Sequence, residues 1–234
     1  MSEVFVASLR GPGVARSCPR SGSSRPALTR LLYVFDAYCG WCWGFREAVE
    51  GFAAAHPDLP MDVVSGGLFV GERRRPLRSM TFIPEANARL TQMTGATFGP
   101  GYEALLGTDF TPDSTGAAAG FAALRAQAPA RALELAGRVQ AAFFRDGLSL
   151  HDAGTFRRVA REAGLDASRV PDPLDPALAA PDFDLARRLG VGGFPTLALV
   201  DGDRGWLLAR GAAPRADLEA RLATARRAAQ ENAA

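Results

Sequence analysis

The folded part of the chain begins with short apolar runs on either side of one helical stretch. The segment LLYVF at 31–35 is apolar, aromatic and partly β-branched, which is typical of a strand buried on both faces. Apolar side chains then recur at helical spacing over 45–56, and MDVVS at 61–65 predicts a second strand. These segments together predict a β-α-β unit.

Helical patterns dominate the middle of the chain, and no strand is evident over 78–180. Alanine- and leucine-rich periodic stretches cover 115–128 and 129–145, and a further helix at 155–165 ends at Gly164. We therefore expect a block of helices between two parts that contain strands.

The C-terminal part returns to a mixed pattern. A short helix is predicted at 182–191, strands at 196–200 and 206–210 on either side of a DGDRG turn, and a last helix at 214–229. The complete order is β-α-β, a helical block, then α-β-β-α. This order predicts an α/β fold with an inserted all-helical subdomain.

The same patterns divide the chain into four parts. Residues 1–29 are rich in Ser, Arg, Gly and Pro without periodicity, which predicts a flexible tail. One folded domain is expected from 30–66 and 181–234, interrupted by the helical subdomain at 67–180.

Composition and charge argue against several classes of function. Of the 234 residues 47% are hydrophobic, enough for a sizeable core, and 27 basic against 25 acidic residues leave a net charge of only +2. Nucleic acid is therefore not expected as a partner. No apolar run approaches the roughly 18 to 20 residues of a membrane helix, so no membrane association is expected. The start of the chain lacks the pattern of a secretory signal, and three cysteines are too few for a disulfide scaffold, which together predict a cytoplasmic protein.

The strongest chemical signal is the motif Cys39-Gly40-Trp41-Cys42 at the predicted junction of the first strand and the first helix. A cysteine at the amino end of a helix lies among unpaired backbone N–H groups and the positive end of the helix dipole, which favour the reactive thiolate. We expect Cys39 to form a mixed disulfide with substrate, and Cys42, one turn further on, to be the buried thiol that resolves it. The redox group would be the internal disulfide, and no other cofactor is expected.

Two neighbours of the cysteines are candidates for supporting roles. Trp41 is expected to shield the site and to contact substrate. Asp36, three residues before Cys39, has two interpretations: a carboxylate that caps the helix, or a charge that tunes the thiols. The Gly-Trp centre carries no ionisable group, which predicts a redox potential toward the reducing end.

A C-x-x-C pair can also be half of a zinc site, which needs two further ligands. The third cysteine, Cys18, lies in the predicted tail, and the two histidines, His56 and His151, are remote from the pair in sequence. No metal is therefore expected within one chain, while a metal shared between two copies stays open as an alternative.

A second motif, VGGFPT at 191–196, introduces the strand predicted near the C-terminus. A proline that begins a strand after glycines is compatible with a cis peptide bond. The combination of YVFDAYCGWCWGF, the helical block and GVGGFPTLALV resembles the DsbA-like branch of the thioredoxin superfamily, which includes predicted cytoplasmic protein-disulfide isomerases of bacteria. The resemblance implies a thioredoxin-like fold with an inserted all-helical subdomain. It also implies that Pro195 forms a cis-proline loop against the C-x-x-C, where Phe194, Pro195 and Thr196 bind an extended substrate strand.

The resemblance implies a thiol–disulfide oxidoreductase or isomerase that acts on protein or small-molecule disulfides and thiols. The Gly-Trp centre departs from the Pro-His centre of the strongly oxidising periplasmic members. Two alternatives stay open. One is a glutathione-dependent transferase or isomerase of the kappa-class or hydroxychromene-carboxylate isomerase type, with glutathione as co-substrate, and the other is a non-catalytic, chaperone-like binding module. The patterns do not encode the redox partner, the direction of the reaction, or whether two copies form a homodimer.

Overall fold

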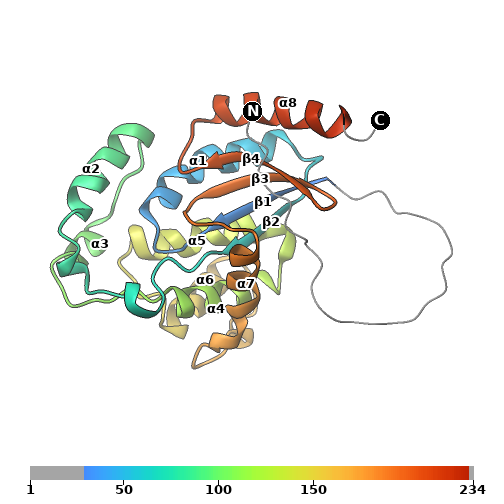
Figure 1. Cartoon of the computed structure of the whole chain (residues 1–234). Coiled ribbons are helices and arrows are strands. Elements are labelled where there is room, and N and C mark those ends of the chain that lie inside the picture. Colours follow the sequence, from blue (N-terminus) through green and yellow to red (C-terminus); the bar gives the residue numbers. More distant parts are fainter. Residues whose placement is uncertain (1–28, 232–234) are drawn as a thin grey trace.

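The computed structural model describes residues 29–231, and Figure 1 shows the arrangement of their elements. The tail predicted at 1–29, with Cys18, lies outside the described residues apart from Thr29. The fold class predicted from the sequence is confirmed: a thioredoxin-like sheet is combined with a large set of helices.

A four-stranded sheet forms the centre of the molecule, in the order β2-β1-β3-β4. Its strands are β1 (Arg30–Phe35), β2 (Met61–Ser65), β3 (Thr196–Asp201) and β4 (Arg204–Arg210). The β1–β2 pair is parallel, and the β1–β3 and β3–β4 pairs are antiparallel. All four predicted strands are confirmed, with small shifts of their bounds.

Eight α-helices accompany this sheet in the described part of the chain. They are α1 (Gly40–Ala55), α2 (Ile83–Thr94), α3 (Pro100–Leu105), α4 (Ser114–Arg125), α5 (Ala132–Phe144), α6 (Ala153–Glu162), α7 (Ala180–Arg188) and α8 (Arg215–Glu231). The sequence predicted helical character over the whole middle segment, but its pattern did not separate α2 and α3. The reason is their low burial, since α2 buries only Leu90 and α3 only Tyr102.

Strand β1 is buried on both faces, as its continuous apolar run predicted. Leu31 and Phe35 point into the larger core, which also contains side chains of α1, α5 and α8. Leu32 and Val34 point into a smaller core on the opposite face, which α7 covers. Figure 1 shows α8 running along the sheet, while α2 and α3 stand out to one side. Helices therefore cover both faces of the sheet.

The inserted helices share the larger core with the sheet. Phe121 of α4 meets Phe35 of β1 edge to face, with ring centroids 5.1 Å apart. Helices α4 and α6 approach so closely at Gly120 that a Cβ atom there would lie 2.3 Å from the ring of Phe156. Only glycine fits at this contact. Helices α4, α5 and α6 thus pack together, and they cover one face of the sheet through the larger core.

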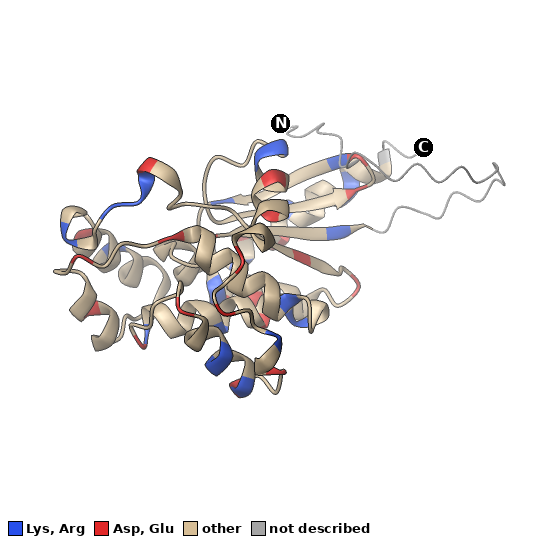
Figure 2. Cartoon of the chain, turned by 90° about the horizontal axis from the view of Figure 1, so that it is seen from below, with Lys and Arg blue, Asp and Glu red and all other residues tan. Residues whose placement is uncertain are grey.

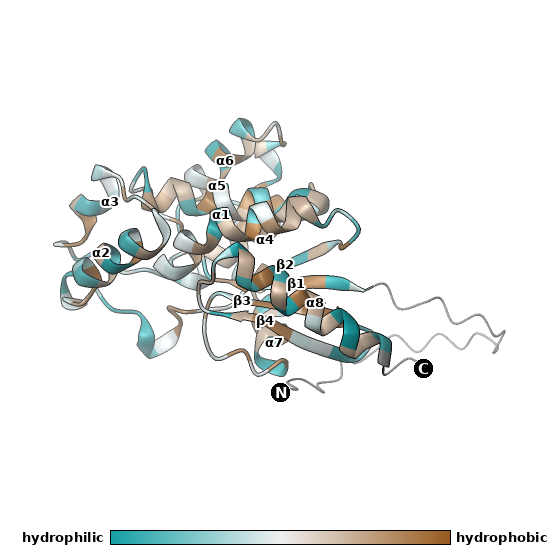
Figure 3. Cartoon of the chain, turned by 90° about the horizontal axis from the view of Figure 1, so that it is seen from above, coloured by the Kyte–Doolittle hydropathy of each residue, from teal (hydrophilic) through white to brown (hydrophobic). Residues whose placement is uncertain are grey.

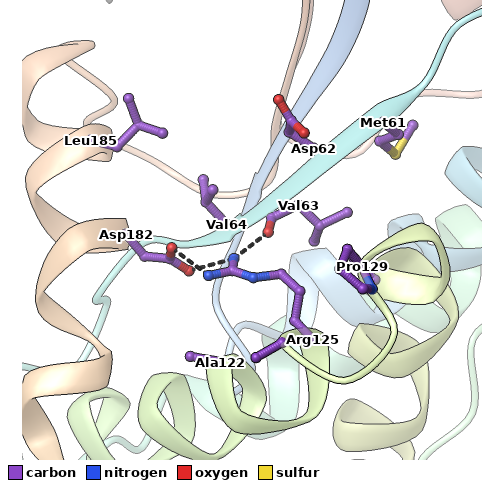
Figure 4. A pocket seen from close by; sticks show the side chains of 11 residues that line it. Met61, Asp62, Val63, Val64, Ala122, Arg125, Pro129, Asp182 and Leu185 are labelled. Carbon is purple, nitrogen blue, oxygen red and sulfur yellow. Dashed lines mark hydrogen bonds and ion pairs between the residues drawn. The ribbon is translucent and has the colours of Figure 1, made fainter. Parts of the chain in front are cut away.

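A buried ion pair ties α7 to β2, the strand at the edge of the sheet. The guanidinium of Arg125, from the end of α4, binds the carboxylate of Asp182 with a shortest N–O distance of 2.8 Å, and it also donates to the carbonyl of Val63 (Figure 4). Asp182 is 5% exposed and accepts a further hydrogen bond of 2.8 Å from the backbone N–H of Ser65. Every polar atom of this buried carboxylate is thus paired, and the pair joins α4, β2 and α7.

The charged residues are interspersed over the surface rather than gathered by sign (Figure 2). Hydrophilic and hydrophobic residues alternate along α8 (Figure 3). Within residues 29–231, none of the helices combines the length and the apolar character that crossing a membrane requires.

Candidate active site

The two cysteines lie in the first turn of α1, where the end of β1 delivers the chain to the larger core. Cys39 is the N-cap, with extended backbone angles, and its carbonyl accepts hydrogen bonds from the N–H groups of Cys42 (3.0 Å) and Trp43 (3.1 Å). The side chain of this N-cap residue makes no hydrogen bond to the free N–H groups of the turn. The sulfur of Cys39 therefore lies at the positive end of the helix dipole, as the sequence predicted.

Both cysteines are free thiols in this structure and both are buried, with Cys39 5% and Cys42 0% exposed. The two thiols are close enough for Cys39 to alter the pKa of Cys42. Burial raises the pKa of Cys42 well above its usual value, and the hydrogen bond and charge of Cys39 raise it further. Cys42 therefore holds its proton at neutral pH in the dithiol state.

Asp36 is buried between the end of β1 and the segment that follows β2. Its carboxylate accepts hydrogen bonds from the N–H groups of Tyr38 (3.0 Å) and Leu68 (2.7 Å), and its backbone carbonyl accepts one from the N–H of Cys39 (3.1 Å). The interpretation of Asp36 as the cap of α1 is wrong, because the chain turns before the helix and uses this carboxylate to close that turn. Burial raises the pKa of Asp36, and the hydrogen bonds from Leu68 and its other partners offset part of the rise.

The loop at Pro195 meets the dithiol although it is remote in sequence. The thiol of Cys39 donates to the carbonyl of Phe194 with a sulfur–oxygen distance of 3.5 Å, and the peptide bond between Phe194 and Pro195 is cis. Thr196 begins β3, and its hydroxyl donates to the carbonyl of Gly193 (2.9 Å), which closes the loop. The sequence-predicted residues of the two motifs are therefore side by side.

The ring of Phe194 packs directly on the backbone of Gly66, the residue after β2. A Cβ atom at Gly66 would lie 1.9 Å from the ring, so a side chain cannot be added there without moving it. The N–H of Gly66 donates to the carbonyl of Phe35 (2.7 Å), which fixes this backbone to β1. The position of the Phe194 carbonyl thus depends on a glycine that the sequence did not single out.

An apolar groove of about 250 Å³ opens beside Cys39. We use this name for the cavity whose walls include Trp41, Phe69, Met80, Phe82, Ile83 and Leu90. No charged side chain lines it, and Phe82 is 65% exposed at its margin. Since Cys39 itself is nearly covered, the groove is an approach by which an apolar group can reach its sulfur. The sequence placed Trp41 here but missed the contribution of α2.

Tyr33 is a further neighbour that the sequence did not point out. It lies on β1, is 2% exposed, and is close enough to Cys42 for the two groups to interact. Burial raises the pKa of Tyr33 well above its usual value, and the negative charges that Cys42 and Cys39 can carry raise it further. Tyr33 therefore remains a neutral phenol that faces the resolving sulfur. Because side chains alternate between the two faces of a strand, the sequence could have placed Tyr33 on the same face as Leu31 and Phe35. It could not have predicted that Tyr33 lies next to Cys42.

The histidines weighed as metal ligands lie elsewhere. His56 pairs with Glu219 of α8 at 2.7 Å, and His151 stacks on Phe110 with ring centroids 5.3 Å apart. Within the described ranges, no group of three or more His, Cys, Asp or Glu side chains is arranged to hold a metal ion.

Comparison with known proteins identifies the family. The model of the DSBA-like thioredoxin domain matches residues 30–223. The chain belongs to this family. A comparison with curated protein sequences gives no match.

Several solved structures share the fold of this DSBA-like chain. The cytosolic disulfide reductase DsbM from Pseudomonas aeruginosa is 27% identical, with a TM-score of 0.69 over 85% of this chain and 98% of that one. A Nitrosomonas europaea protein, provisionally described as a protein disulfide isomerase, is 22% identical, with a TM-score of 0.75 over 84% of this chain and 96% of that one. A 2-hydroxychromene-2-carboxylate isomerase is 18% identical, with a TM-score of 0.59 over 87% of this chain and 97% of that one. A structure of DsbM with glutathione is 27% identical, with a TM-score of 0.67 over 85% of this chain and 99% of that one.

Proposed function

We propose that this protein is a cytoplasmic thiol–disulfide oxidoreductase that works mainly as a reductase, with Cys39 as the attacking sulfur and Cys42 as the resolving sulfur. One observation carries the proposal: two free thiols lie near each other in the first turn of α1, and Cys39 contacts the loop at Pro195. Membership of the DSBA-like family and the likeness to a cytosolic disulfide reductase support it.

The reaction begins when the thiolate of Cys39 attacks one sulfur of a substrate disulfide. The substrate's sulfur–sulfur bond breaks, one half leaves as a thiolate that takes up a proton, and the other half remains bound to Cys39 as a mixed disulfide. Cys42 then loses its proton and attacks the sulfur of Cys39, which releases the second half as a thiol. The substrate gains two electrons and two protons, and the protein is left with a Cys39–Cys42 disulfide.

The Phe194 carbonyl changes partner during this cycle. In the dithiol it accepts the hydrogen of the Cys39 thiol, and that hydrogen is absent once Cys39 is part of a mixed disulfide. The carbonyl is then available to an N–H group of an extended substrate strand, as in peptide binding by β-addition. Phe194, Pro195 and Thr196 would form one side of the substrate site, and Trp41 the other.

The apolar groove would receive an apolar side chain next to the substrate disulfide. Its walls come largely from the segment 67–180, the proposed helical insertion, so this segment would set the choice of substrate. The second interpretation of Asp36, as a charge that tunes the thiols, is part of the proposal, because its charge is one of the causes that raise the pKa of Cys42.

The oxidised protein must be returned to the dithiol by an external reductant. We propose glutathione for this step, on the basis of the related DsbM solved with glutathione. Two molecules of glutathione supply the two electrons: the first opens the internal disulfide as a mixed disulfide, and the second leaves with it as oxidised glutathione.

The test measures reduction of a protein disulfide by the wild type and by three serine variants. Cys39→Ser and Cys42→Ser should each abolish turnover, whereas the matched control Cys18→Ser should keep it. A glutathione-dependent transferase or isomerase would instead survive Cys42→Ser, and a binding module would hold unfolded chains equally well after both changes. Thiol trapping in defined ratios of reduced to oxidised glutathione gives the redox potential, and a potential at the oxidising end would contradict a reductase.

A further inference from the structure

A second cavity, of about 680 Å³, shares Phe194 with the candidate active site. It lies between the segment after β2, helix α7 and the loop that leads to Pro195, and we call it the arginine cavity. Its walls include Val70, Arg73, Phe183, Arg187, Val191 and Phe194. Its volume is within the range of small-molecule binding sites.

The arginine cavity differs from the apolar groove in its charge. Its lining is apolar or glycine backbone over most of its area, and the charged side chains in it are both arginines, Arg73 and Arg187. No carboxylate belongs to the lining. A ligand that fits this chemistry has an apolar body and at least one negative charge.

Arg73 is held in place without being neutralised. Its guanidinium donates one hydrogen bond of 2.8 Å to the carbonyl of Gly67, and no carboxylate of the described residues lies within ion-pair distance of it. Arg187 differs, because its guanidinium is paired with Asp184 at 2.7 Å. A guanidinium carries five N–H donors in a planar fork that matches a carboxylate, so Arg73 retains donors for a ligand.

Phe194 links the arginine cavity to the reacting sulfur. Its carbonyl lies 3.5 Å from the sulfur of Cys39, and the same residue forms part of the cavity wall. The wall of the arginine cavity and the contact with the reacting sulfur are therefore formed by one residue.

We propose that the arginine cavity is a subsite for the carboxylate-bearing half of a small disulfide substrate, with Arg73 binding the carboxylate. This inference rests on the proposed function and specifies the substrate class of the same site. The apolar groove and the arginine cavity would then favour disulfides with an apolar group near the sulfurs and an acid a few bonds away.

The test compares two aromatic disulfides that differ in charge. The reduced protein, in a Cys18→Ser background that leaves only the two active-site thiols, is mixed with dithiobis(nitrobenzoate), which bears a carboxylate on each ring, or with uncharged dithiodipyridine. Stopped-flow absorbance gives the rate constant for attack on each. Arg73→Gln should slow the reaction with dithiobis(nitrobenzoate) about tenfold, as expected for the loss of a charge-assisted hydrogen bond, and change that with dithiodipyridine less than about twofold. Arg73→Lys, which keeps the charge and loses the fork, should fall between.

Arg75→Gln is the matched control, because it removes the same charge from the same basic run but does not line the cavity. Benzoate, which cannot react, should slow the attack on dithiobis(nitrobenzoate) by the wild type but not by Arg73→Gln. Equal slowing by Arg75→Gln would mean a long-range charge effect, and equal slowing of both disulfides would mean a structural defect, so either result overturns the subsite. If the wild type attacks neither disulfide, or if Cys39→Ser still attacks both, the proposed function fails instead.

Discussion

Gly66→Ala should damage the site through the ring of Phe194. The new Cβ atom would lie 1.9 Å from one ring atom and 2.2 Å from the next. Ordinary contact between carbon atoms requires about 3.5–4.0 Å, so the ring must move by roughly 1.5–2 Å. The backbone of Gly66 is bound to β1, and the ring therefore moves rather than the glycine.

The expected cost is about 1–3 kcal/mol of unfolding free energy, typical of overpacking at a buried contact. Because the carbonyl of the same phenylalanine is only 3.5 Å from the sulfur of Cys39, the rate of attack on substrate should also fall in the molecules that remain folded. Urea denaturation measures the first effect, and stopped-flow kinetics with a small disulfide measures the second.

A double-mutant cycle separates this clash from other effects of the substitution. Gly66→Ala should cost almost nothing in a Phe194→Ala background, because the atoms that it meets are gone. Gly107→Ala, at a position with open space around the new Cβ atom, controls for the smaller conformational entropy of an unfolded chain with alanine. Equal costs of Gly66→Ala with and without the ring would refute the explanation.

Three further predictions concern the buried ion pair, the resolving thiol and acid stability. Asp182→Ala should lower the unfolding free energy by about 3 kcal/mol, because it leaves Arg125 without its buried partner, and a paired Asp182→Leu, Arg125→Met variant should recover most of the loss in urea denaturation. Tyr33→Phe should shift the release of substrate from the mixed disulfide to higher pH, because the Cys42 thiolate loses a hydrogen-bond donor; an unchanged pH profile in single-turnover kinetics would contradict this role. The pKa of Glu219 is lowered, first by its hydrogen bond to the histidine at the end of α1, so the stability it contributes is complete above its unfolded pKa of about 4.3 and is lost as the pH falls through the folded value. Glu219→Gln should therefore flatten the decline of the unfolding free energy below about pH 4.3, as followed by circular dichroism.

The sequence predicted the strands and helices in which apolar residues follow a regular pattern. Strand β1 was predicted because its apolar run after Arg30 is continuous, and both of its faces are buried. The position of Cys39 at the start of α1 followed from the change from strand to helix pattern. The contact between Cys39 and Phe194 joins residues that are 155 positions apart, and only the family resemblance suggested it.

The features that the sequence missed depend on contacts rather than on periodicity. Helix α2 supplies a wall of the apolar groove but fully buries only Leu90, so it lacks the regular apolar spacing of a buried helix. Gly66 has no sequence signal, since its backbone lies outside the left-handed region and only the nearby ring excludes a side chain. Asp36 is spaced as a cap would be, yet its carboxylate closes the preceding turn instead.

The effect of Cys39 on the pKa of the resolving thiol gives the proposed cycle its order. Three causes raise the pKa of Cys42 most, and two of them, the hydrogen bond and the charge of Cys39, exist only while Cys39 is free. Once Cys39 is part of a mixed disulfide, those two contributions vanish while burial remains, so the pKa of Cys42 falls toward its usual value. Cys42 therefore becomes a better nucleophile after substrate has been captured and not before. The remaining effect of burial still slows its deprotonation, which prolongs the mixed disulfide. In the proposed cycle a second thiol of the substrate would have this time to attack in place of Cys42, and a substrate with such a thiol would then be rearranged rather than reduced.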